Sequence, residues 1–299
     1  MTDFLQNCID GVMIGSSYAL LALGFTIIFG VMRRLNLSFG PTIMLGAFGG
    51  AWLYLHFNIN PWLVLLACIV FTVAAGVYVE RLCFNAIKRN VAITSMVSSF
   101  VIWMQLEEIA IHILPDRTSP FPPLFASLSF EAGPFYVRSE YLFMFAVAVA
   151  AVFAVERILH RTWFGLRLRA VAEDPRAAAY MGINAGRVSV YAFVLVSVLG
   201  AVAGYLILAA DQQVTPFFGL WATFKGLIAM MLGGMGSLPG AIIGGLLLGV
   251  IETQSLWYFG NEYKDLAAYL VLFLMLIARP GGIMGQRLVE RRRLAFRRV

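Results

Sequence analysis

The sequence E-R-I-L-H-R-T-W-F-G-L-R-L-R-A-V-A-E-D-P-R-A-A-A-Y-M-G-I-N-A-G-R, residues 156–187, separates two long apolar segments. Within it, Asp174 can cap a helix, Pro175 suits the first helical position, and Gly182 suits the left-handed turn that ends a helix. A helix of roughly two turns is too short to be stable alone in water, so its flanks or a partner must hold it. The segment is therefore either a structured linker between two membrane spans or a helix that docks on a soluble partner.

The composition places the rest of the chain in a membrane. It is 61% hydrophobic and 13% charged, whereas soluble domains are about 25% charged. Several continuous apolar runs approach the ~20 residues that cross a bilayer as a helix. Because lipid leaves helices or closed barrels as the spanning structures, unbroken runs indicate helices. We expect an all-α polytopic membrane helix bundle in which residues 1–299 form a single domain.

One of the expected spans differs from the others. The segment 219–235 is short, follows a break at Thr215-Pro216, and carries Lys225. A short or interrupted span often lies beside a permeation site, although a merely short helix packed in the bundle is the alternative. We expect eight full spans and this short, broken or re-entrant one, with helices near residues 11–31, 38–56, 61–79, 92–113, 139–159, 188–209, 219–235, 239–258 and 263–279.

The basic residues predict the orientation. Most of the 22 Lys and Arg residues fall between alternate spans, at 33–34, 81–89 and 156–187, and in the tail 280–299. All these segments come to one face, which the positive-inside rule assigns to the cytoplasm. The N-terminus is then periplasmic and the C-terminus cytoplasmic. The net charge of +6 reflects this topology, so we expect no nucleic-acid partner.

Polar side chains within the apolar segments are candidates for a translocation pathway. Charges at membrane depth are costly and usually face a bundle interior or a watery cavity. The alternative is that the acidic residues lie near the outer water layer. Glu108 and His112 are four positions apart, so they can pair on one helix face. The candidates are Gln105, Glu108, Lys225 and Glu252, together with Asn36 and Ser38 of the motif N-L-S-F-G at 36–40.

The glycine pattern favours helix packing over chemistry. Gly240 and Gly244, and likewise Gly245 and Gly249, are spaced so that helix backbones can approach closely. The neighbouring run G-G-M-G-S-L-P-G lacks the Gly-Lys-Ser/Thr of a P-loop. The three histidines lie in separate segments without metal-ligand spacing, so we expect no metal site and no catalytic group.

Five stretches together resemble the permeases of the LivH type, which serve branched-chain amino acid transport. They are G-S-S-Y-A-L-L-A-L-G-F-T-I-I-F-G-V at 15–31, N-L-S-F-G at 36–40, R-A-V-A-E-D-P-R-A-A-A-Y-M-G-I-N-A-G-R-V at 169–188, F-K-G-L-I-A-M-M-L-G-G-M-G-S-L-P-G-A-I-I-G-G-L-L-L-G at 224–249, and E-Y-K-D at 262–265. The resemblance covers nearly the whole chain in order.

The resemblance implies a permease subunit of an ATP-binding-cassette importer in the bacterial inner membrane. It implies a homologous second permease, two ATPase subunits and a periplasmic substrate-binding protein, with ATP bound by the partners and no cofactor on this chain. Lipid surrounds such a subunit. The family's cytoplasmic coupling loop would be 160–187, and the residues expected to meet an ATPase are Asp174, Pro175, Arg176, Ala177, Ala178, Met181 and Gly182.

The substrate is less firmly indicated than the family. The family pattern at 36–40 is usually N-x-A-H-G, and here Ser38 and Phe39 replace the Ala and His. Related importers for urea or short amides, or for aromatic or aliphatic carboxylates, use similar permeases. Another class is an ion-coupled carrier that would load its ion on Glu108 or Glu252, and a membrane enzyme ranks last.

Overall fold

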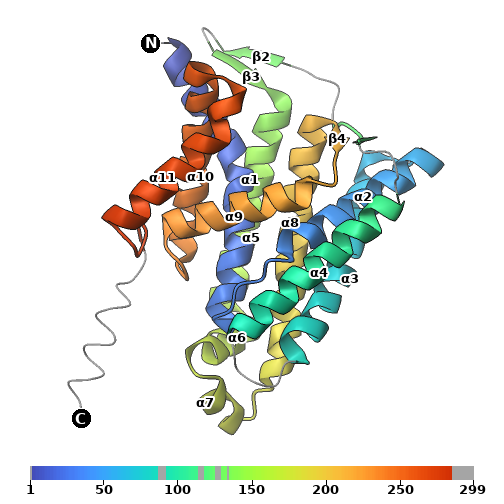
Figure 1. Cartoon of the computed structure of the whole chain (residues 1–299), viewed down its shortest axis with the longest axis vertical. Helices are drawn as coiled ribbons and strands as arrows, with labels where there is room; N and C mark the ends of the chain where they lie inside the picture. Colours follow the sequence, from blue (N-terminus) through green and yellow to red (C-terminus); the bar gives the residue numbers. More distant parts are fainter. Residues whose placement is uncertain (1, 87–91, 114–117, 125–128, 133–134, 285–299) are drawn as a thin grey trace.

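A computed structural model describes residues 2–86, 92–113, 118–124, 129–132 and 135–284 (Figure 1). These residues form a bundle of helices, as the apolar runs predicted, together with four short strands that were not predicted. The helices are α1 (Thr2–Met32), α2 (Phe39–Phe57), α3 (Pro61–Val79), the π-helical turn η1 (Glu80–Asn85), α4 (Ala92–Ile113), α5 (Ser139–Arg161), α6 (Trp163–Glu173), α7 (Pro175–Tyr180), α8 (Ala185–Asp211), α9 (Phe218–Gly233), α10 (Leu238–Phe259), the 3-10 turn η2 (Asn261–Tyr263) and α11 (Lys264–Ala278). The strands are β1 (Ser119–Pro120), β2 (Ser129–Ala132), β3 (Phe135–Arg138) and β4 (Gln213–Val214), paired antiparallel as β1 with β4 and β2 with β3.

All nine expected segments are helical, but they differ in whether they are long and apolar enough to cross a membrane. Within the described residues, five helices are long and apolar enough to cross a membrane, namely α1, α3 with η1, α5, α8 and α10. The segments expected at 38–56, 92–113 and 263–279 form α2, α4 and α11, which are shorter or less apolar. The number of full spans therefore stays a prediction.

The segments that were expected on opposite faces of the membrane lie at opposite ends of the bundle. Helices α6 and α7 lie at one end, and the N-terminus and the β2–β3 hairpin lie at the other (Figure 1). This is the separation that the alternating basic loops predicted. The basic tail expected at 280–299 lies outside the described residues from position 285 onward.

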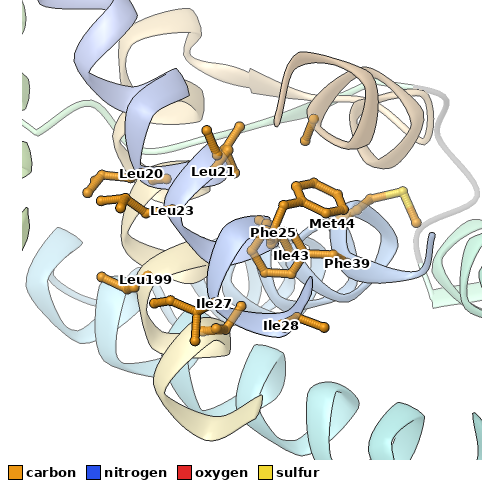
Figure 2. Packing of buried hydrophobic residues seen from close by; sticks show 14 of the residues in the cluster. Leu20, Leu21, Leu23, Phe25, Ile27, Ile28, Phe39, Ile43, Met44 and Leu199 are labelled. Carbon is orange, nitrogen blue, oxygen red and sulfur yellow. The ribbon is translucent and has the colours of Figure 1, made fainter. Parts of the chain in front are cut away.

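Helix α1 lies at the centre of the bundle. Because it is apolar on every side, it can be buried all around rather than along one stripe. It packs against α5, α8, α9 and α10. Figure 2 shows part of the core, with Leu20, Leu21, Leu23, Phe25, Ile27 and Ile28 of α1, Phe39, Ile43 and Met44 of α2, and Leu199 of α8.

Glycines bring helix backbones into contact, which confirms the packing role predicted for them. A Cβ added at Gly245 or Gly249 of α10 would collide with the backbone of α1. Gly240 and Gly244 face α9 instead, where an added Cβ at Gly240 would lie 2.5 Å from the Gly233 carbonyl oxygen. The two consecutive glycine pairs thus place α10 against two different helices.

Helix α9 is the short element that the sequence singled out. Helix α8 ends at Asp211, and the following residue Gln212 has a left-handed φ of 56°. Strand β4 then leads to α9, which has 16 residues and lies across the long axis of the bundle (Figure 1). The start of α9 contacts the start of α2, since an added Cβ at Gly40 would lie 2.8 Å from Thr223 N. The predicted break before α9 is therefore present, and it brings two helix starts together inside the bundle.

Candidate functional site

The short helix expected at 175–182 is present, and it lies between the predicted capping residues. Asp174 Oδ1 accepts hydrogen bonds from Arg176 N at 2.8 Å and Ala177 N at 3.2 Å. Pro175 opens α7, and Gly182 follows it with a φ of 78°. Since the cap satisfies amide groups that a helix start leaves free, Asp174 stabilises this short helix from within the chain.

The side chains of α7 divide into an inner and an outer face. Ala178 is 4% exposed, and its carbonyl oxygen accepts a hydrogen bond of 3.0 Å from Ile183 N. Tyr180 is 92% exposed and Met181 is 82% exposed. Tyr180 and Met181 are therefore open to solvent, whereas Ala178 packs within the chain. The sequence reasoning selected Met181 but missed Tyr180, although an aromatic residue at the end of a polar helix was a usable signal.

The segment before α7 contains a second helix that the sequence reasoning did not predict. Helix α6 begins after Thr162, whose hydroxyl accepts a hydrogen bond of 3.1 Å from Gly165 N. Leu168 and Val171 are buried, and this inner face holds α6 against the bundle. The loop at 160–187 is thus two short helices at the base of α8, with Trp163 exposed on their surface.

A group of charged residues links four helices. This Lys225 cluster consists of Tyr18 on α1, Lys225 on α9, Glu252 on α10, and Lys264 and Asp265 on α11. Lys225 Nζ forms one ion pair with Glu252 and another, 2.6 Å long, with Asp265. The Tyr18 hydroxyl donates to Glu252 Oε2 over 2.9 Å, and Lys264 Nζ lies 3.8 Å from the same oxygen.

The charges of the Lys225 cluster balance one another. Two ammonium groups meet two carboxylates, and Lys225 is 3% exposed while Glu252 is 1% exposed. Because a buried charge is costly unless it is paired, the burial of Lys225 depends on its carboxylate partners. The sequence reasoning selected Lys225 and Glu252 for one pathway, and the structure brings these two together. It missed Tyr18, Lys264 and Asp265, although the motif E-Y-K-D contained the last two.

The other pathway candidates lie at two separate places. Asn36 and Ser38 are buried in the loop between α1 and α2. Ser38 N donates to Asn36 Oδ1 over 3.1 Å, and the Ser38 hydroxyl donates to the carbonyl oxygen of Ser99 on α4. Phe39, which stands where relatives of the LivH type usually have His, packs edge-on against Phe25 with ring centroids 4.9 Å apart. This loop is therefore anchored inside the bundle by α4 and α1.

Gln105 and Glu108 lie on the exposed face of α4. The Tyr78 hydroxyl donates to Gln105 Oε1 over 3.1 Å. Glu108 pairs with His112 at 3.5 Å, as their spacing predicted, and its side chain is 68% exposed. Both candidates thus face out of this chain rather than into its core.

Comparison with known proteins agrees with this architecture. Residues 7–278 match the family model described as "Branched-chain amino acid transport system / permease component". The chain is 31% identical over 303 residues to the high-affinity branched-chain amino acid transport system permease protein LivH of Escherichia coli (strain K12), covering 96% of this chain and 97% of that one. It is 26% identical to LivM of the same organism, covering 93% of this chain and 70% of that one.

A solved structure shares the fold. It is described as an inward-facing conformation of a putative metal-chelate type ABC transporter, and it aligns with a TM-score of 0.52 at 15% identity, covering 91% of this chain and 84% of that one. At this low sequence identity, the alignment shows a shared fold and nothing about a shared function. The family match spans most of the chain and the LivH match spans almost all of both proteins. This chain is a multi-pass membrane protein that belongs to the family of permease components of branched-chain amino acid transport systems.

Proposed function

We propose that this chain is a membrane subunit of an ATP-binding-cassette importer that carries branched-chain or related hydrophobic amino acids across a bacterial inner membrane. The observation that carries the proposal is the match to LivH over nearly the full length of both chains. The end that holds α6 and α7 faces the cytoplasm, because the segment 156–187 that contains them is rich in arginine. The N-terminus is periplasmic and the C-terminus cytoplasmic.

The subunit works with partners that supply what it lacks. Two ATPase subunits bind ATP, because this sequence has no P-loop, and the chain itself binds no cofactor. A periplasmic binding protein delivers the substrate. A homologous second permease completes the membrane part, which is supported by the similarity of this chain to both LivH and LivM of one organism. Lipid covers the remaining apolar surface.

Helix α7 is the contact for an ATPase subunit. Asp174 and Pro175 set the start of the helix, and Gly182 ends it. Tyr180 and Met181 project from it as exposed apolar side chains, with Arg176 and Ala177 beside them. Ala178 contributes from the inner face, where it is buried and its carbonyl oxygen accepts a hydrogen bond from Ile183 N in the connection to α8.

The translocation pathway lies between this chain and the second permease. Gln105 and Glu108 face outward on α4, where exposure of charge to lipid is costly. Asn36 and Ser38 lie near the buried side of the same helix, where the Ser38 hydroxyl donates to the Ser99 carbonyl oxygen. Lys225 and Glu252 do not line this surface. They lie in the charge-balanced Lys225 cluster, which joins the short helix α9 to α10.

Reconstituted transport tests this function. The permease is co-expressed and purified with a second permease and two ATPase subunits from the same organism, placed in proteoliposomes, and supplied with a substrate-binding protein from that organism and radiolabelled leucine. We expect uptake that requires both ATP and the binding protein. Uptake of urea or of benzoate in place of leucine would reassign the substrate. Uptake that persists without ATP and collapses with an ion gradient would instead identify a secondary carrier.

The outer face of α7 gives a first mutational prediction. Replacing Tyr180 and Met181 together by alanine removes two exposed side chains while leaving the cap and Ala178 unchanged. Tyrosine contacts at interfaces are often worth about 2 kcal/mol, so ATPase binding should weaken roughly 30-fold. Co-purification and titration of the ATPase against the membrane complex measure this. Phe153→Ala, an exposed aromatic position on α5, is the matched control and should bind normally. Equal binding by all three proteins would exclude α7 as the contact.

A further inference from the structure

A buried carboxyl group lies where α3 meets the base of α8. Glu80 is 1% exposed and begins the π-helical turn η1. Its Oε1 accepts a hydrogen bond of 2.8 Å from the Ser189 hydroxyl. Its Oε2 is buried and finds no hydrogen-bond partner among the described residues. A group of this kind is expensive to keep in an apolar interior, so its presence requires an explanation.

Glu80 contacts the part of α8 that directly follows the docking helix. Ser189 lies in the first turns of α8, which begins at Ala185 after α7 and a short connection. One helical turn further on, Phe84 of η1 packs against Phe193 of α8 with ring centroids 5.2 Å apart. The turn η1 is therefore joined to the base of α8 by a polar and an aromatic contact in succession. Wide helical turns of this type occur frequently at functional sites.

The rest of α3 is also fixed to α8. A Cβ added at Gly76 would lie 3.2 Å from Ser197 Cβ, so the helices touch near their middle. At the far end the Tyr205 hydroxyl donates to the Pro61 carbonyl oxygen over 2.7 Å. With contacts at three levels, α3 lies along α8 over most of its length. Glu80 supplies the hydrogen bond at the end of this pair that lies next to α7.

We propose that Glu80 is a positioning residue through which a displacement of α7, entering at the base of α8, is passed to α3. This inference rests on the proposed function, since it needs an ATPase that displaces α7. A hydrogen bond to an acidic side chain is directional, whereas an apolar contact at the same place would allow the helices to slide. An apolar pair could pack at this position with no loss of stability. The carboxyl group therefore serves to fix the position of α3 along α8 rather than to stabilise the fold.

The test separates coupling from folding. The full reconstituted complex is compared with Glu80→Leu, which removes the acceptor, and Glu80→Gln, which retains an acceptor of the same shape. We expect Glu80→Leu to keep the thermal midpoint and ATP hydrolysis of the parent but to import about 5- to 10-fold fewer leucine molecules per ATP, a typical size for coupling between sites. Glu80→Gln should restore most of this ratio.

Controls make each outcome decisive. Thr72→Val removes another buried polar atom of α3, one that faces α2, and should leave the ratio unchanged. An unchanged ratio in Glu80→Leu overturns the proposal. So does a loss of uptake that merely parallels a fall in thermal midpoint, because that marks a purely structural residue. If the parent complex binds no ATPase subunit, the proposed function fails first, and this failure is visible before any variant is compared.

Discussion

Replacing Lys225 by methionine should lower the thermal midpoint of the detergent-solubilised permease by about 5–10 °C. Lys225 is 3% exposed, and it forms ion pairs with Glu252 and Asp265. Without it, the buried Glu252 keeps one hydrogen bond from Tyr18 and a weak contact with Lys264 at 3.8 Å. Removing one partner of a buried ion pair costs about 3–5 kcal/mol, which corresponds to the stated shift for a chain of this size.

Two variants test whether the pairing itself is responsible. Lys264→Met removes a more exposed lysine at a longer distance from Glu252, so it should shift the midpoint by about 1–2 °C at most. Adding Glu252→Gln to Lys225→Met removes the stranded buried charge. The charges that remain, on Lys264 and Asp265, are partly exposed to solvent, so much of the stability should return. Equal shifts of the thermal midpoint for Lys225→Met and Lys264→Met would contradict the claim that the ion pairs of Lys225 stabilise the fold. No recovery of the midpoint in the double variant would contradict it as well.

Local features of this fold could be read directly from the sequence. The cap at Asp174 and the left-handed Gly182 need only neighbouring residues, so their pattern predicted α7 correctly. The glycine spacing around Gly245 predicted a close helix contact, because an absent side chain admits a backbone whichever helix supplies it. The break at Thr215-Pro216 was likewise visible, since proline cannot continue the preceding ladder of hydrogen bonds.

Features that depend on distant residues could not be predicted in the same way. Tyr18 and Glu252 are 234 positions apart, so no local pattern indicates that they are hydrogen-bonded. The inward direction of Ala178 follows from how α8 leaves α7, and not from the small size of alanine. In the sequence, Gln105 and Glu252 could not be distinguished, since each is a polar residue within an apolar segment. The structure places Gln105 on the outer face of α4 and Glu252 in the buried Lys225 cluster.

The substitution Gly15→Leu should abolish accumulation of the folded permease in the membrane. An added Cβ at Gly15 on α1 would lie 2.8 Å from the Gly245 carbonyl oxygen and 2.9 Å from Leu246 Cα on α10. Both obstacles are backbone atoms, which cannot rotate away as a side chain can. The helices would have to separate along the most extensive contact of the central helix α1, at a cost of about 3 kcal/mol or more. Membrane-fraction yield and gel-filtration profile measure the result.

The same substitution at Gly30 provides the matched control within α1. No described atom lies within 4 Å of the Cβ that would be added at Gly30, so Gly30→Leu meets open space. Both variants replace a helical glycine by the better helix former leucine, a gain of up to about 1 kcal/mol that is common to them. Any difference in yield therefore measures packing and not helix propensity. If both variants accumulate like the parent, the close approach of α1 and α10 does not hold the bundle together. If only Gly15→Leu fails, the close backbone contact that Gly15 permits between α1 and α10 is needed to hold α1 at the centre of the bundle.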